Sequence, residues 1–234
     1  MTAELLVIIP TRGRAAVLPA LWANWVHYTD PDLTDLLFAV DDDDPDLWEY
    51  LGRQQEGIGD RWMSGPRVRM VRTLNHSAVT WAPHYRYVGF LGDDHRPRTP
   101  GWDHRMVEAL SGGLGVAYGD DLLQREAMPT AVVMTSNIVQ ALGYMAPGTM
   151  THLCVDLVWK AWGEALERLF WLPDVVIEHV HPAAGKAELD AGYVEVNSAE
   201  MVAADSAAFY AYRDGTEQDG PSLAADVDKL RALL

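Results

Sequence analysis

The sequence predicts an α/β fold in which a mainly parallel central sheet is flanked by helices. Two observations lead to this prediction. Short, continuous apolar runs of strand length recur along the first half of the chain, and segments with apolar residues at helical spacing follow several of them. Because the loops at the carboxyl ends of parallel strands gather at one edge of the sheet, the polar residues that end these runs are the first candidates for a functional site.

The first strand, turn and helix are expected at the start of the chain. Residues 4–10 form an apolar run that Pro10 ends, which is typical of a strand buried on both faces. Residues 11–14 contain a glycine and two arginines and are expected to form a turn. Residues 15–28 place leucines and tryptophans at helical spacing, so this region predicts the first half of a βαβ unit.

The same order then repeats through the rest of the first half. The expected elements are a strand at 35–40, a helix from residue 46, a strand at 67–73, a poorly defined connection at 75–83, a strand at 85–91 and a helix at 102–110.

The second half is less regular, and one of its segments is ambiguous between strand and helix. The expected elements are a strand at 115–118, a strand or helix start at 130–134, a short helix at 137–143, a stronger helix at 153–169, a strand at 175–177 and two peripheral helices in the alanine-rich tail 198–234.

Charge limits the classes of partner that the chain can bind. With 18 basic against 34 acidic residues, the formal net charge is -16, which disfavours extended binding to a phosphate backbone. The alternating arginines of residues 67–72 are interpreted as the solvated face of a strand. The N-terminus lacks a secretory signal and no apolar run is long enough to span a membrane, so we expect a soluble protein located in the cytoplasm.

Two acidic clusters follow predicted strands and are the strongest candidates for a site. Residues 41–44 are four consecutive aspartates, and Asp93, Asp94 and His95 follow the run 85–91. Two such clusters at one edge of a sheet would repel each other unless a cation neutralised them. We therefore predict a Mg²⁺ or Mn²⁺ site, with Asp94 as the preferred ligand and Asp93 assisting it.

Several other side chains are candidates for the same site. His179 and His181 alternate, so in an extended segment both rings face the same side and one of them could complete a metal site. The guanidinium groups of Arg12 and Arg14 match the oxygens of a diphosphate. The glycines of a dinucleotide fingerprint and the Gly-Lys-Ser/Thr of a P-loop are absent from the sequence, which disfavours dehydrogenases and P-loop NTPases.

Two further residues lie next to this predicted edge. Asp156 falls near the start of the predicted helix 153–169, where the helix dipole stabilises a carboxylate that can act as a base or bind a substrate hydroxyl; the alternative is a helix cap. Trp102 follows Pro100 and Gly101, directly after the second acidic cluster, and is expected to face a sugar or acceptor.

Taken in order, these motifs resemble those of GT-A-fold glycosyltransferases of the family 2 type. The likeness rests on residues 7–14, 39–43 and 89–95 with the following Pro-Gly-Trp, and on the later segments 155–157 and 179–182. In detail the chain looks most like small bacteriophage-encoded glycosyltransferases. The resemblance implies a Rossmann-like GT-A fold in one domain. Residues 1–110 would bind the nucleotide sugar, residues 111–197 would bind the acceptor and catalyse transfer, and residues 198–234 would form a helical tail.

The resemblance also assigns roles to residues. It implies that Pro10, Thr11, Arg12 and Arg14 lie against the nucleotide, that Asp41 and Asp42 contact the base and ribose, and that Asp93 and Asp94 stand for the DXD motif. The expected metal ligands are Asp94 and His181, or less favourably His179, and the expected base is Asp156.

The expected activity is therefore transfer of a sugar from a UDP- or GDP-linked donor to an acceptor hydroxyl, with Mn²⁺ or Mg²⁺. For a phage-like enzyme in the host cytoplasm, the acceptor could be a virion protein or a modified nucleobase, and the acidity of the chain favours protein or small-molecule acceptors. Two alternatives are a sugar-phosphate nucleotidyltransferase and a non-catalytic binding or virion-associated protein that retains the fold.

Overall fold

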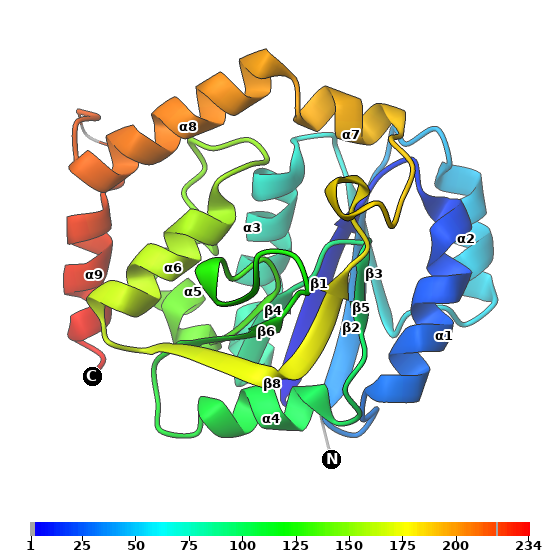
Figure 1. The fold of residues 1–234 in the computed structure, drawn as a ribbon, viewed down its shortest axis with the longest axis horizontal. Coiled ribbons are helices and arrows are strands. Elements are labelled where there is room, and N and C mark those ends of the chain that lie inside the picture. The colour runs from blue at the N-terminus through cyan, green and yellow to red at the C-terminus, as the bar shows by residue number, and fades with distance from the viewer. Residues whose placement is uncertain (1–2, 219) are drawn as a thin grey trace.

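The computed structural model describes residues 3–218 and 220–234, and these form one mixed, eight-stranded sheet between helical layers (Figure 1). The strand order is β3-β2-β1-β4-β7-β6-β8-β5. The predicted α/β class with a mostly parallel sheet is confirmed, since four of the neighbouring pairs are parallel (β1 with β2, β1 with β4, β2 with β3, and β6 with β8).

The first half of the chain builds the parallel part of the sheet. Its elements are β1 (Leu5–Thr11), η1 (Ala15–Val17), α1 (Leu18–Tyr28), β2 (Thr34–Asp41), α2 (Leu47–Gln55), β3 (Arg61–Gly65), α3 (Met70–Trp81), η2 (Ala82–His84) and β4 (Tyr87–Phe90). Strand β1 lies at the centre of this part and pairs with β2 on one side and with β4 on the other.

The second half adds the remaining strands and most of the helices. Its elements are β5 (His95–Pro97), α4 (Trp102–Ala109), β6 (Val116–Asp120), η3 (Arg125–Ala127), β7 (Val132–Thr135), α5 (Ser136–Leu142), α6 (Val155–Ala165), β8 (Leu169–His179), η4 (Pro182–Ala184), α7 (Ala191–Val196), α8 (Ala199–Asp214) and α9 (Leu223–Arg231). The segment that was ambiguous between strand and helix is strand β7, which pairs antiparallel with β4 and β6.

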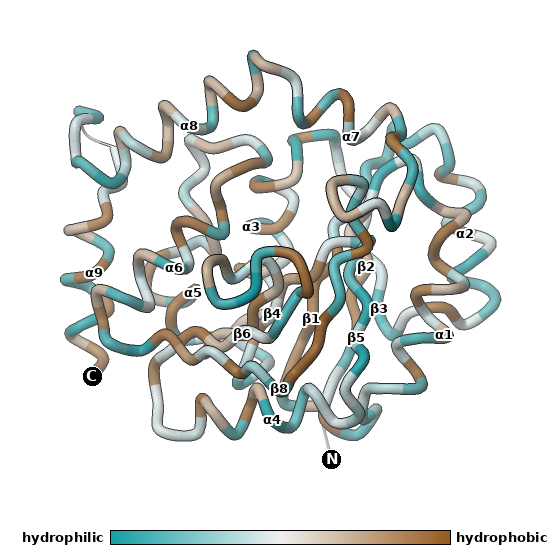
Figure 2. Tube along the Cα trace, viewed as in Figure 1, coloured by the Kyte–Doolittle hydropathy of each residue, from teal (hydrophilic) through white to brown (hydrophobic). Residues whose placement is uncertain are grey.

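Alternation of side chains along β1 divides the interior into two hydrophobic layers. Leu6 and Ile8 pack on one face with residues of α3, α5, α6, α8 and α9, whereas Leu5, Val7 and Ile9 pack on the other face with residues of α1, α2 and α4. Figure 2 shows the hydrophobic stretch of β1 at the centre of the molecule. A strand buried on both faces explains why this segment is apolar at every position.

The predicted strand at 67–73 is wrong, because the strand lies earlier, at Arg61–Gly65, and the helix α3 begins at Met70. The predicted loop at 75–83 is mostly part of that helix. Val71, Leu74 and Ala78 are buried at spacings of three and four residues, which is the helical period. The alternation of Arg67 and Arg69 just before them suggested a strand instead. Arg67 and Arg69 lie in the exposed loop between these two elements.

The alanine-rich tail forms helices α8 and α9, as expected, and it is fastened to the core. Phe209, Tyr212, Val227 and Leu230 are buried in the cluster that contains α6. Asp205 of α8 is also buried and accepts hydrogen bonds from the backbone N–H groups of residues 151–153, in the loop that leads into α6.

Candidate functional site

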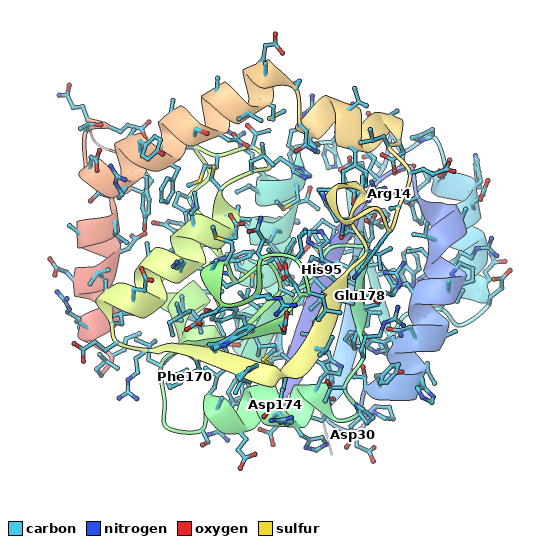
Figure 3. The ribbon with its side chains drawn as sticks, viewed as in Figure 1. Arg14, Asp30, His95, Phe170, Asp174 and Glu178 are labelled. Atoms are coloured by element: carbon cyan, nitrogen blue, oxygen red, sulfur yellow. The ribbon has the colours of Figure 1, made fainter. Side chains whose placement is uncertain are left out.

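The candidate site lies at the edge of the sheet where β1, β2, β4, β6 and β8 end. Figure 3 shows Arg14, His95 and Glu178 together at this end of the sheet, whereas Asp30 lies at the opposite end. Strands β6 and β8 are parallel to each other and both deliver acidic or histidine residues here, namely Asp121 after β6 and His179 at the end of β8.

Asp93 precedes the candidate metal ligand Asp94 and is held by two side chains, one at the end of β1 and one in the loop that follows it. Thr11 Oγ1 donates to Asp93 Oδ2 at 2.7 Å, and Arg14 donates to Asp93 Oδ1 at the same distance. Burial opposes the charge of Arg14, but the carboxylates of Asp93 and Asp190 raise its pKa above the ordinary value, so the guanidinium stays charged. Asp93 therefore positions the loop after β4 and is neutralised by an arginine.

Asp94 has different neighbours and forms the centre of the site. Its Oδ2 lies 3.2 Å from His179 Nε2, and its Oδ1 lies 3.3 Å from His95 Nδ1. The hydroxyl of Tyr193 also donates to Asp94. Burial raises the pKa of Asp94, but the hydrogen bond from His179 and the charge of that imidazole outweigh it and hold the pKa well below the usual range. Asp94 is therefore a carboxylate at neutral pH.

His179 lies between two carboxylates. Its Nδ1 is 3.9 Å from Asp121 Oδ2, opposite the contact of its Nε2 with Asp94. Burial lowers the pKa of His179, but Asp121 and Asp94 raise it to about 9. Its ring stacks on that of His95, with centroids 4.2 Å apart. Burial and the charge on His179 lower the pKa of His95, whose Nδ1 accepts a hydrogen bond from the Gly92 N–H.

Among the described residues, Asp94, His95 and His179 form a group that could hold a metal ion. One ligand atom from each lies within 4.8 Å of the others, and His179 Nδ1 is buried without a hydrogen-bond partner in the described structure. One carboxylate and two imidazoles suit Mn²⁺ better than Mg²⁺, which prefers oxygen ligands. A metal at His179 Nε2 would replace the proton there, and one at His95 would compete with the Gly92 N–H.

His181 lies beside this group, and Asp156 lies at the start of α6. The rings of His181 and His179 have centroids 4.8 Å apart, and His181 Nδ1 accepts a hydrogen bond from the Ala183 N–H. Asp156 lies in the first turn of α6, where the Leu157 N–H donates to its Oδ1 at 2.9 Å. Burial raises the pKa of Asp156 above the ordinary value, although that hydrogen bond opposes the change.

The first acidic cluster faces the first loop. Arg12 donates to Asp41 Oδ2 at 2.9 Å and to Asp43 Oδ1 at 2.6 Å, so a guanidinium group supplies the cation that the sequence required here. Asp44 accepts from the Gly13 N–H, which fixes the turn. Asp42 is exposed, and Pro10 lies within β1, opposite Ala39 of β2.

A cavity of about 300 Å³ lies beside Asp41, at the ends of β2 and β3. Gly65, Arg72 and His76 contribute to its wall, together with apolar atoms of β2 and of the β3–α3 loop. Its size and its mixture of apolar and polar groups are typical of a small-molecule site.

Trp102 does not face this edge, so its expected contact with a sugar or acceptor is wrong. Its side chain is fully buried, packs edge-on against Trp25 at a centroid distance of 5.8 Å, and donates from Nε1 to Thr29 Oγ1. The Pro-Gly before it starts α4, which is why the aromatic residue turns into the core.

Sequence reasoning did not single out Tyr193, Asp121 or Asp190 for this site. Asp190 pairs with Arg14, and the Arg14 guanidinium lies 4.5 Å from the Tyr193 ring centroid. Asp190 and Tyr193 belong to the segment around α7, which returns across the edge of the sheet from a distant part of the sequence (Figure 1). Asp121 directly follows strand β6, as Asp93 and Asp94 follow β4. This position after a strand was the sequence feature that could have identified Asp121 as a site residue.

The architecture is that of GT-A-type glycosyltransferases, and solved structures of such proteins are similar to this chain. The mannosyltransferase PcManGT from Pyrobaculum calidifontis, in complex with GDP-Man and Mn²⁺, has a TM-score of 0.62 at 15% identity, covering 100% of this chain and 81% of that one. The predicted GT-A fold is thereby confirmed.

A second protein of similar structure is TarS from S. aureus. Its 1–349 fragment in complex with UDP has a TM-score of 0.57 at 11% identity, covering 74% of this chain and 59% of that chain. The same fragment in complex with UDP-GlcNAc covers 82% of this chain and 64% of that one, again with a TM-score of 0.57. This chain thus spans about three fifths of the TarS fragment.

No family model matches the chain, and no curated protein matches it by sequence. Within the described residues, no helix is long and apolar enough to cross a membrane.

Proposed function

We propose that this protein is a metal-dependent glycosyltransferase that moves a sugar from a UDP- or GDP-linked donor to an acceptor hydroxyl. The observation that carries the proposal is the group Asp94, His95 and His179 at the carboxyl edge of a GT-A-type sheet. The GDP-Man and Mn²⁺ bound to PcManGT, and the UDP and UDP-GlcNAc bound to TarS, support this choice of donor.

The nucleoside would occupy the cavity beside Asp41. Asp41 and the exposed Asp42 would contact the base and ribose, and the end of β1 with the residue after it, namely Pro10, Thr11 and Arg12, would lie against the nucleotide. Arg14 stays charged and lies between this loop and Asp93, so it can pair with a diphosphate oxygen when Asp190 moves away.

Asp94, His95 and His179 would hold Mn²⁺, which would neutralise the charge on the leaving diphosphate. His181 is the alternative ligand, because its ring lies next to His179. Mg²⁺ is the less suitable ion for a site with two imidazoles.

Asp156 would act as the base for the acceptor hydroxyl. Its raised pKa, caused by burial, brings the carboxylate closer to the basicity that proton abstraction requires. It lies on α6, facing the region of His179, which contributes to its electrostatic environment. A carboxylate that takes the acceptor proton allows the oxygen to attack the sugar as the diphosphate leaves.

The proposal is tested by measuring release of GDP from GDP-mannose and of UDP from UDP-GlcNAc, with and without Mn²⁺. We expect Mn²⁺-dependent release by the wild type, and about 100-fold or greater loss in Asp94→Asn. Asp30→Asn, at the opposite end of the sheet, is the matched control and should keep full activity. If the protein binds a nucleotide sugar but forms no GDP or UDP from it, with or without a panel of acceptors, the transferase proposal is wrong.

A further inference from the structure

A second surface groove lies away from the proposed donor site. It has a volume of about 810 Å³ and runs between α6, the loop that contains η3, and the start of β8. Figure 1 shows these three segments side by side. Its floor includes Tyr118 and Trp171, whose rings pack with centroids 5.1 Å apart.

We infer that this groove binds a neutral oligosaccharide as the acceptor of the transfer reaction, an inference that rests on the proposed function. The geometry connects the groove with the proposed base. Lys160, in the wall of the groove, follows Asp156 by four residues on α6, so both side chains lie on one helix face about 6 Å apart along the axis. Asp156 lies about one helical turn beyond the end of the groove that Lys160 marks, so we propose that a chain bound in the groove places its terminal hydroxyl near this carboxylate.

The chemistry of the groove fits a saccharide. One face of a sugar ring is made of C–H groups and packs against an aromatic ring, while its hydroxyls need polar partners. Trp171 is partly buried and offers such a ring. The same groove is lined by carboxylates that can accept hydrogen bonds from hydroxyls, contributed by Glu126, Glu164 and Glu167.

The charge of the groove disfavours polyanionic acceptors. Its charged residues are three acids and two bases, namely Glu126, Glu164, Glu167, Arg125 and Lys160.

The wall formed by the loop is already fixed in place. Asp121 Oδ1 accepts hydrogen bonds from the N–H groups of residues 123–125. Tyr118 Oη donates to the Glu126 carbonyl at 2.8 Å, and Lys160 Nζ donates to the Ala127 carbonyl at 2.9 Å. A groove with rigid walls loses little entropy when it binds a ligand. The same Asp121 lies beside His179, so the loop joins the groove to the candidate metal group.

Binding is tested directly by NMR on the whole protein without donor. The indole N–H signal of Trp171 is assigned by its loss in Trp171→Phe, and the protein is titrated with hexasaccharides of glucose, mannose and N-acetylglucosamine. Single-stranded DNA serves as the polyanion. We expect the Trp171 signal to shift with at least one saccharide and not with DNA. No shift with any saccharide, or a shift with DNA alone, overturns the inference.

The acceptor role is tested by kinetics with the saccharide that binds. We expect Trp171→Ala to raise the acceptor KM roughly tenfold, with a smaller effect on kcat and unchanged donor hydrolysis in the absence of acceptor. Trp48→Phe, on the exposed surface of α2, is the control and should change neither. An unchanged acceptor KM in Trp171→Ala would overturn the acceptor role. Absence of any nucleotide release by the wild type, with or without acceptors, would instead refute the proposed function, while the NMR titration would still test the groove.

Discussion

Replacing Asp205 by alanine is expected to destabilise the protein strongly, because this single carboxylate of α8 holds the loop before α6. Asp205 is 1% exposed and accepts from the N–H groups of Thr151, His152 and Leu153 at 2.8, 2.8 and 2.6 Å. Hydrogen bonds to a charged group contribute about 1.5–3 kcal/mol each, and they are not additive. Alanine would also leave the loop N–H groups unpaired. We therefore expect a loss of about 3–5 kcal/mol in unfolding free energy.

The assay is denaturant unfolding of the wild type and of Asp205→Ala, monitored by tryptophan fluorescence. Asp214→Ala is the matched control, since Asp214 ends the same helix with a half-exposed side chain paired only with its neighbour Arg213 in the described structure. Surface substitutions of this kind change stability by about 0.5 kcal/mol or less. If Asp205→Ala lost less than about 1 kcal/mol, the reasoning that the tail anchors this loop would be refuted.

Three further predictions concern the candidate metal group and helix α7, which carries Tyr193 and Glu195. In the metal-free protein, Asp94→Asn should lower the NMR titration midpoint of His179 from about 9 toward its ordinary value; an unchanged midpoint would contradict the assigned ion pair. Tyr193→Phe removes the hydroxyl that donates to Asp94, so calorimetry should show roughly fivefold tighter Mn²⁺ binding, and weaker binding would mean that the hydroxyl assists the metal. Arg69 and Arg67 hold the pKa of Glu195 below its ordinary value, so the ion pair should be present above pH ~4.3 and be lost as pH falls through the folded-state pKa. Carbon-detected NMR should give a Glu195 midpoint below that of an unpaired glutamate, and a midpoint at or above it would contradict the pairing.

The fold was predictable where one period dominated the sequence. Residues 4–10 and 35–40 are apolar at successive positions because both faces of their strands are buried, and strands β1 and β2 lie there. The segment 67–73 misled because Arg67 and Arg69 alternate in an exposed loop, while the buried positions of α3 only become visible from Val71 onward.

The site was predictable as far as strand ends define it. Asp41, Asp93, Asp94 and His179 all lie at the carboxyl edge, as expected from their positions after apolar runs. Which acid faces which cation depends on side-chain geometry: Asp93 turns toward an arginine, and Asp94 turns toward the histidines. No local pattern carries that information.

The contribution of the segment around α7 could not be predicted. Tyr193 is separated from Asp94 by 99 residues, and its contact depends on how the chain returns over the sheet after β8. The predicted contact of Trp102 with a sugar or acceptor is wrong for a related reason. A residue that lies close to a site in the sequence can still direct its side chain into the core, as the fully buried Trp102 does.

The most direct test of the account is a calorimetric titration of GDP and UDP into the wild type and Asp94→Asn, each with and without Mn²⁺. We expect one of the two nucleotides to bind the wild type only when Mn²⁺ is present, and to bind Asp94→Asn at least about tenfold more weakly. Nucleotide binding that is equally tight without Mn²⁺, or that is unaffected by Asp94→Asn, would contradict a diphosphate held through a metal at this group. Failure of both nucleotides to bind under any of these conditions would contradict the proposed donor site itself.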